Sequence, residues 1–327
     1  MRTAGWMAAG AAALVSVALN AQQALRTAWG DPDFTGIYTS DNSIGVPFER
    51  PTELGDRAEL TDDEYATRVD ANEEQIAKDQ NPLPESDFSA EDPSAINASR
   101  HWLERPDVPS RATSLVVDPP NGRLPELTPA GQQRFAERRA RRARGLPASY
   151  TDFSNYDRCL TRGLVGSIVP VIYGNGTQIV QAPGVVVIRN EMIHEARVIP
   201  LDGSAHAGAG VRLWMGDSRG RFDGDTLVIE TTNFTDRTGL GGNGNGAVHS
   251  DKLTLVERLR RIDADTVRYE FTVNDPETYT RPWTAAFDLD SEPGYEIYEY
   301  ACHEGNLGLA NMLSAARAEE RAEAAKR

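Results

Sequence analysis

From about residue 163 onward, short runs of alternating apolar and polar residues are separated by turn residues. The clearest run spans 252–275 and predicts a β-hairpin whose turn lies at Asp263-Ala264-Asp265. Apolar side chains occupy every second position on both sides of this turn: Leu253, Leu255 and Leu259 before it, and Val267, Tyr269, Phe271 and Val273 after it. Glu257 falls on the same face as the leucines. This alternation is typical of antiparallel strands with one buried face.

Similar runs span 177–203, 220–234, 279–290 and 295–305. Together they predict about seven or eight antiparallel strands, which is typical of a barrel or a sandwich. Some faces mix apolar and charged residues: Glu191, Ile193, Glu195 and Arg197 are expected on one face, and Met192, His194 and Ala196 on the other. A small closed barrel can enclose one ligand among inward-facing residues. We therefore expect a mainly β fold, an antiparallel lipocalin-like barrel, with a sandwich as the alternative.

The first half lacks this alternation and is rich in Pro, Asp and Glu, with one short strand at best within residues 29–41. A capping box at 61–64 predicts a helix over 62–78. Thr128-Pro129 predicts a second helix that ends near Arg144. We expect a signal peptide over residues 1–21, an extended and partly helical arm over 22–150 that wraps the core, and a β-barrel-like domain over 151–327 with a closing C-terminal helix.

The N-terminus combines a positive charge at Arg2, an uncharged apolar or small-residue run over 6–19, and a small residue at Ala21. This pattern is typical of a secretory signal peptide, so the protein is expected to be periplasmic or secreted. A membrane anchor is the alternative, but it needs ~20 strongly apolar residues and this run is shorter and Ala-rich. We expect no membrane span after cleavage.

Charge narrows the class of partner. The 327 residues include 34 Lys and Arg and 49 Asp and Glu, a formal charge of −15. Binding to nucleic acid depends mostly on Lys and Arg contacts with phosphate, and docking on anionic lipid depends on basic clusters, so both are disfavoured. A small-molecule ligand or substrate is the partner that we expect.

Cys159 and Cys302 are the only two cysteines. In an oxidising compartment they are expected to form one disulfide, which would close a loop of about 140 residues. Two buried free thiols are the alternative. Two cysteines also exclude a zinc site with four Cys ligands.

Two short motifs match known signatures but lie in the wrong context. Gly216-Asp-Ser218-Arg-Gly220 matches the G-x-S-x-G nucleophile elbow, yet a turn and a strand follow it instead of a helix. The G-x-G-x-x-G match at 239–244 lies between predicted strands and indicates a flexible loop instead of a nucleotide site. No H-E-x-x-H motif occurs, so we expect no metal and no cofactor, although ligands from distant strands remain an alternative.

The remaining candidates are acid–base groups and aromatic residues near predicted strands. His194 and His303 are expected as base and acid, with Glu195 and Glu230 as orienting carboxylates and Arg219 as the partner of an oxyanion. The expected substrate-binding residues are Trp214, Trp283, Tyr298, Tyr300 and Arg281. Each of these residues taken alone also fits a purely structural role.

Long segments of the chain resemble a large family of secreted, mostly uncharacterised bacterial proteins. The segments that carry the resemblance are 155–163 (NYDRCLTRG), 170–184, 191–197 (EMIHEAR), 214–234 (ending SRGRFDGDTLVIETTNF) and 298–306 (YEYACHEGN), with weaker likeness in the opening WGDPDFTGIYT and in RPTEL. The resemblance implies an exported β-rich protein and is consistent with one bridge between the two cysteines. It implies no reaction and no catalytic set.

Two functions are therefore expected from the sequence. The first is an isomerase, hydratase or lyase type of enzyme that uses acid–base chemistry on a small, partly apolar or aromatic molecule. The second is a non-catalytic small-molecule binding protein of the cell envelope. A structural protein of the envelope is a third and weaker alternative.

Overall fold

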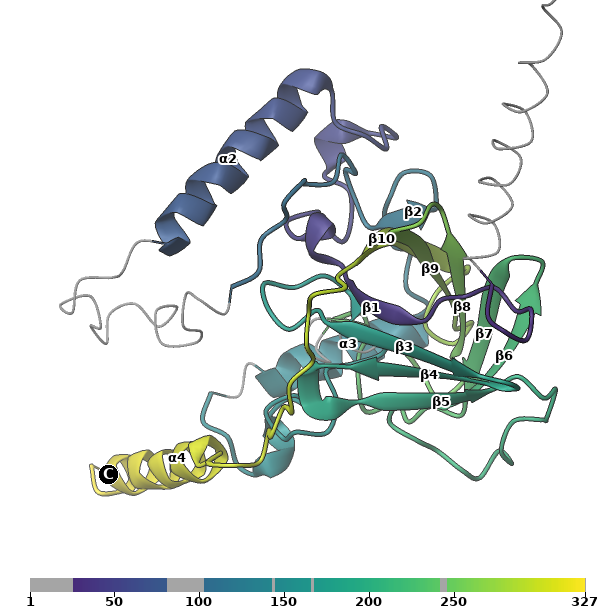
Figure 1. Cartoon of the computed structure of the whole chain (residues 1–327). Coiled ribbons are helices and arrows are strands. Elements are labelled where there is room, and N and C mark those ends of the chain that lie inside the picture. Colours follow the sequence, from purple (N-terminus) through teal and green to yellow (C-terminus); the bar gives the residue numbers. More distant parts are fainter. Residues whose placement is uncertain (1–25, 81–102, 143–144, 166–167, 242–245, 327) are drawn as a thin grey trace, which may run out of the picture.

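The protein is described by a computed structural model over residues 26–80, 103–142, 145–165, 168–241 and 246–326 (Figure 1). The predicted signal peptide lies outside these residues. Ten strands form one sheet: β1 Gly36–Thr39, β2 Val116–Asp118, β3 Thr177–Ala182, β4 Val185–Asn190, β5 Ala196–Pro200, β6 Asp217–Asp223, β7 Thr226–Thr232, β8 Thr254–Arg261, β9 Thr266–Asn274 and β10 Trp283–Ser291.

Nine of these strands follow one another in the order β5-β4-β3-β1-β10-β9-β8-β7-β6, and β2 adds to β10. Each neighbouring pair along this order is antiparallel. The sheet curls until β5 approaches β6, where a Cβ on Gly220 would come within 2.8 Å of the Ile199 side chain. The expected antiparallel barrel is thus confirmed, and it is nearly closed.

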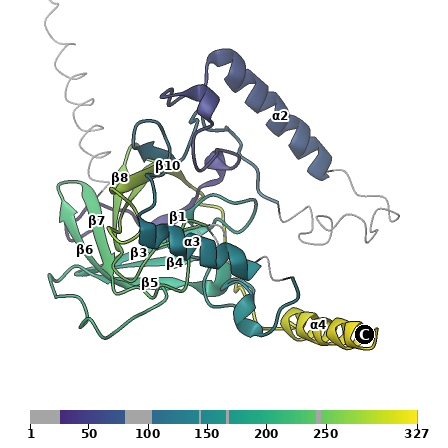
Figure 2. The same ribbon diagram turned by 180° about the vertical axis from the view of Figure 1, so that it is seen from behind.

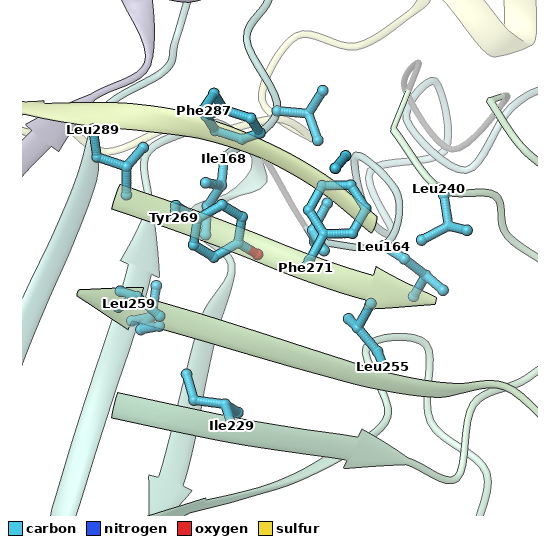
Figure 3. Packing of buried hydrophobic residues seen from close by; sticks show 14 of the residues in the cluster. Leu164, Ile168, Ile229, Leu240, Leu255, Leu259, Tyr269, Phe271, Phe287 and Leu289 are labelled. Atoms are coloured by element: carbon cyan, nitrogen blue, oxygen red, sulfur yellow. The ribbon is translucent and has the colours of Figure 1, made fainter. Parts of the chain in front are cut away.

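The barrel interior is filled by large side chains from alternate strand positions (Figure 3). The β8–β9 hairpin has the predicted turn and the predicted inward face, with Leu255, Leu259, Tyr269 and Phe271 at most 1% exposed. Burying a side chain of this size contributes about 1.5–3 kcal/mol. The alternation read from the sequence therefore accounts for most of the core.

One buried ion pair interrupts this apolar interior. Arg197 of β5 donates from both terminal nitrogens to Glu257 of β8, at 2.5 and 2.8 Å. The Tyr269 hydroxyl donates to the same carboxylate at 2.6 Å. The side chains of Arg197 and Glu257 are 5% and 0% exposed, so each charge depends on the other for solvation.

Among the described residues the α-helices beside the barrel are α2 Asp62–Gln80, α3 Pro129–Arg142 and α4 Gly308–Ala324. The same residues include the short 3-10 helices η1 Asp41–Ser43, η2 Thr52–Leu54, η6 Tyr150–Asp152 and η8 Met192–His194. The capping box at the start of α2 and the Thr128 cap of α3 form as expected. Within the described residues, no helix combines the length and apolarity that crossing a membrane requires.

The helices contact loops rather than the sheet. α2 stands beside the barrel and is tied to residues 105–112, for example by Arg68 donating to the Ser110 carbonyl (Figures 1 and 2). α3 packs so closely on the loop before β10 that a Cβ on Gly131 would come within 2.3 Å of the Thr278 carbonyl oxygen. α4 extends away from the strands, and its Arg317 donates to the carbonyls of residues 147 and 148.

Two local predictions were wrong. Residues 295–305 form no strand, because they are held by side chains and a disulfide instead of by a backbone ladder. The expected alternation over 191–197 also fails in its first half. The 3-10 helix Met192–His194 interrupts it, and Met192 is buried although it was expected on the face opposite Ile193.

Candidate functional site

Four segments far apart in the sequence meet beside the first residue of β3 and the last residue of β4: 155–165, 170–176, 191–197 and 295–302. A disulfide joins Cys159 to Cys302, which confirms the expected bridge. The Tyr156 hydroxyl lies 2.9 Å from the Tyr173 hydroxyl and 3.1 Å from the Tyr300 hydroxyl. We call this region the tyrosine site.

The backbone around the tyrosine site is strained. Five residues other than glycine have positive φ among the described residues, and four of them lie in these segments: Cys159, Val165, Ile193 and His194, with φ between 47° and 58°. The left-handed region costs an L-residue about 1–2 kcal/mol and is unusual for β-branched residues. Backbone strain of this kind clusters at functional sites, where the surrounding structure imposes it.

His194 connects two of the segments. Its Nδ1 lies 2.9 Å from the Tyr300 carbonyl oxygen, and because a carbonyl only accepts, Nδ1 carries a proton. In the neutral ring Nε2 is then the acceptor. The ring is exposed, so Nε2 is within reach of solvent.

Glu195, the next residue, is 9% exposed, and neither carboxylate oxygen makes a hydrogen bond of normal geometry. Burial raises the pKa of this carboxyl to about 7, although the nearby Thr161 hydroxyl, the Arg162 amide and the charges of Arg197 and Arg162 lower it. A group with a pKa near 7 is half protonated at neutral pH, which suits a general acid or base.

Arg162 lies between Glu195 and the tyrosines. It is 3% exposed, and its guanidinium donates to the carbonyl oxygens of Tyr173 and Gly174. The guanidinium carbon also lies 5.2 Å from the ring centroid of Tyr173 and 5.9 Å from that of Tyr156. Burial lowers the pKa of Arg162 below that of an exposed arginine. Arg162 thus places a positive charge next to both the tyrosine rings and the Glu195 carboxyl.

A second, half-buried carboxyl fastens the N-terminal half of the chain to the same region. Glu104 accepts hydrogen bonds from the backbone N–H groups of Gly174 and Asn175, at 3.0 and 3.2 Å. Asp41 accepts one from the Asn175 side chain at 2.7 Å. Burial, and then the neighbouring charge of Asp41, raise the pKa of Glu104, and burial raises the pKa of Asp41. The two carboxyls therefore hold a proton more firmly than exposed ones do.

These raised pKa values predict that stability falls as pH rises. The folded protein keeps a proton on Glu195 from about pH 4.5, its ordinary pKa, up to about pH 7, whereas the unfolded chain loses it. The free energy of unfolding should decrease across this window and then level off. Glu195→Gln should match the wild type near pH 4 and be more stable above pH 7. Urea unfolding at pH 4, 6 and 8 measures this, with the exposed Glu296→Gln as control; a wild-type curve and a Glu195→Gln curve of equal slope would contradict it.

Two of the predicted catalytic residues lie in another group. Arg219 and Glu230 are opposite each other on β6 and β7. Arg219 contacts Asp217 at 2.8 Å, and His206 lies between Asp217 and Glu230, at 3.2 and 3.4 Å. These contacts fix the loop before β6 to the sheet. Ser218, the serine of the G-x-S-x-G match, is buried on β6 and bonds Thr231, so it is no exposed nucleophile.

The other predicted residues are dispersed. The His303 ring is exposed, and Tyr298 is 72% exposed. Trp283 is 0% exposed and packs among core aromatic rings. Arg281 pairs with Asp118 at the surface, and Trp214 is half-buried. Of the ten candidates, the structure brings His194, Glu195 and Tyr300 together at the tyrosine site.

The sequence reasoning missed Tyr156, Arg162, Tyr173 and Glu104. The first two flank Cys159 in one segment, and a disulfide expected between Cys159 and Cys302 already places that segment beside Tyr300. The expected disulfide, taken together with the polar residues near each cysteine, would have predicted Tyr156 and Arg162 as site residues. The sequence around Glu104 contains no motif that predicts its place at the site.

Comparison with known protein families, characterised proteins and solved structures finds no similar one. Among the described residues, no group of three or more His, Cys, Asp or Glu side chains is arranged to hold a metal ion.

Proposed function

We propose that this protein is an exported enzyme that transfers protons on a small, partly apolar or aromatic molecule at the tyrosine site. Isomerases, hydratases and lyases share this step. The observation that carries the proposal is the buried Glu195 carboxyl, whose pKa burial raises to about 7. It interacts with Arg162, whose guanidinium lies near the rings of Tyr156 and Tyr173. Carboxyls perturbed in this way are enriched at catalytic sites.

The proposed roles follow from placement. Glu195 removes a proton from the substrate or donates one to it. Both roles are open because the protonated and the ionised form of this carboxyl are similarly populated near pH 7. His194 exchanges protons with solvent through Nε2, since Nδ1 is committed to Tyr300. Export is part of the proposal and is supported by the signal-like N-terminus and by the disulfide, which is typical of an oxidising compartment.

Hydrogen–deuterium exchange tests the proposal without knowledge of the substrate. An enzyme that removes a proton from carbon will exchange it for deuterium in D₂O, so pooled small carbonyl and phenolic compounds can be screened by proton NMR. We expect catalysed exchange with at least one compound, and a loss of about 100-fold or more in Glu195→Gln, which cannot ionise. The exposed Glu296→Gln should exchange at the wild-type rate.

Exchange that persists in a folded Glu195→Gln protein would remove Glu195 from the reaction. Absence of exchange with every compound class, while a compound still raises the melting temperature, would favour the alternative of a binding protein. A specific observation supports that alternative: a half-open pocket of about 400 Å³ lies between the end of α3, residues 145–153 and α4, and is lined by Leu146, Pro147, Phe153 and Met312. Its size is within the range of small-ligand sites.

A further inference from the structure

The three hydroxyl groups of the tyrosine site supply three hydrogen-bond donors but make only two hydrogen bonds with one another. Tyr156 lies in the middle and is bonded to Tyr173 on one side and Tyr300 on the other. Each hydroxyl supplies one donor, so three donors serve two hydrogen bonds. Among the described residues, neither terminal hydroxyl has another protein partner. One of the three O–H groups is therefore available to a hydrogen-bond acceptor that does not belong to the protein.

The surroundings favour an acceptor with negative charge. The buried Arg162 guanidinium interacts electrostatically with all three hydroxyl groups. Burial, together with the hydrogen bonds that Tyr156 shares with Tyr173 and Tyr300, raises the pKa of Tyr156 far above 10, so this hydroxyl stays neutral and keeps its proton. A neutral hydroxyl chain beside a fixed positive charge donates more strongly to an anion than to a neutral oxygen.

The geometry points to a single anionic oxygen, and we propose that the Tyr156–Tyr173–Tyr300 hydroxyl chain binds the oxyanion of a small phenolate or enolate. This inference rests on the proposed function and names its class of substrate. Tyr156 joins the three hydroxyls through contacts of 2.9 and 3.1 Å, and the one O–H that these contacts leave free can serve one oxygen atom. The forked donors of Arg162, which would suit a carboxylate or phosphate, are directed at the backbone carbonyls of Tyr173 and Gly174.

Such a site assists the proposed proton transfer directly. Removing a proton from the carbon next to a carbonyl moves an electron pair onto the carbonyl oxygen, and an enolate forms. The proton passes to the Glu195 carboxylate, while the hydroxyl chain stabilises the new oxyanion. In a substrate with a double bond between the β and γ carbons this enolate is conjugated, so Glu195 can return the proton to the γ carbon. The carbonyl group is then restored, the double bond moves to the α and β carbons, and no further reactant is needed. Donors placed in advance at the developing charge are a major source of catalysis.

The test uses 4-nitrophenol as the probe and the full mature chain with its disulfide intact. Nitrophenolate absorbs visible light and nitrophenol does not, so the spectrum reports which form is bound. We expect the bound probe to be mainly phenolate and benzoate to bind at least about 10-fold more weakly. Tyr156→Phe removes the central hydroxyl and should weaken nitrophenolate binding by about 10-fold or more, the effect of a hydrogen bond to a charged group. Tyr150→Phe is the matched control, since Tyr150 is 61% exposed and lies outside the chain of hydroxyls.

Terminal variants keep the test valid if Tyr156→Phe does not fold. Tyr173→Phe and Tyr300→Phe each leave one hydroxyl pair and should each weaken nitrophenolate binding, with an unchanged circular dichroism spectrum. Equal binding of benzoate, of inorganic phosphate or of neutral nitrophenol would overturn the proposed oxyanion class, as would equal nitrophenolate binding by all three variants. Loss of phenolate binding together with intact proton exchange refutes only this inference. Phenolate binding without exchange refutes only the proposed proton transfer.

Discussion

Replacing Arg197 by Met is expected to lower the free energy of unfolding by about 3–5 kcal/mol. The substitution preserves most of the side-chain volume but leaves the Glu257 carboxylate fully buried without its charged partner. An isolated charge in the interior costs far more than an apolar group, because nothing replaces the lost hydration. Urea unfolding at pH 7 measures the loss.

Two comparisons separate this effect from general damage. Arg268→Met breaks a pair with Asp288 whose side chains are 35% and 42% exposed, and it should cost less than about 1 kcal/mol. The triple replacement Arg197→Met, Glu257→Leu and Tyr269→Phe removes every polar group of the buried cluster and should recover most of the loss. If Arg197→Met lowers the free energy of unfolding no more than Arg268→Met does, Glu257 does not remain a buried, unpaired charge in the variant.

The second large effect is expected from the disulfide. Its cysteines are 143 residues apart, and a loop of that length restricts the unfolded chain by about 5 kcal/mol in the chain-entropy account. The double replacement Cys159→Ala and Cys302→Ala should therefore lower the free energy of unfolding by about 2–5 kcal/mol. Denaturation curves of the oxidised wild type and of the double variant provide the comparison.

The bridge should matter to the site as well as to stability. Cys302 follows Tyr300 by two residues, and residues 295–302 are fastened by side chains rather than by a strand ladder. Reduced wild-type protein should behave like the double variant in both unfolding and nitrophenolate binding. Equal stability of oxidised and reduced protein would mean that the unfolded chain is already compact without the bridge.

Much of the barrel could be predicted because its information is local. In the β8–β9 hairpin, apolar residues at alternate positions, such as Leu259 and Tyr269, identify the buried face, and the turn at 263–265 sets the register. The helix starts at 61–64 and 128–129 were equally readable, since capping satisfies orphan backbone groups with neighbouring side chains.

The candidate site could be predicted only in part. His194, Glu195 and Tyr300 lie in segments rich in ionisable and aromatic side chains, and the sequence therefore names them as candidates. Arg219 and Glu230 have equally suitable side chains, yet they serve a contact with His206 and Asp217 instead. Residue type alone does not distinguish these two outcomes, because both need carboxylates and arginines at the ends of strands.

The sequence by itself determined the strand alternation, the helix caps and the pair of cysteines that the fold joins. Only the tertiary structure decided that Tyr156, Tyr173 and Tyr300 share hydrogen bonds and that Glu195 is buried beside Arg162. The left-handed conformations of Ile193 and His194, which end the expected alternation, were also decided there. Local patterns record the preferences of neighbouring residues. A pKa, a shared proton and a strained backbone depend on what distant segments bring to one place, and the packing of the whole chain sets that.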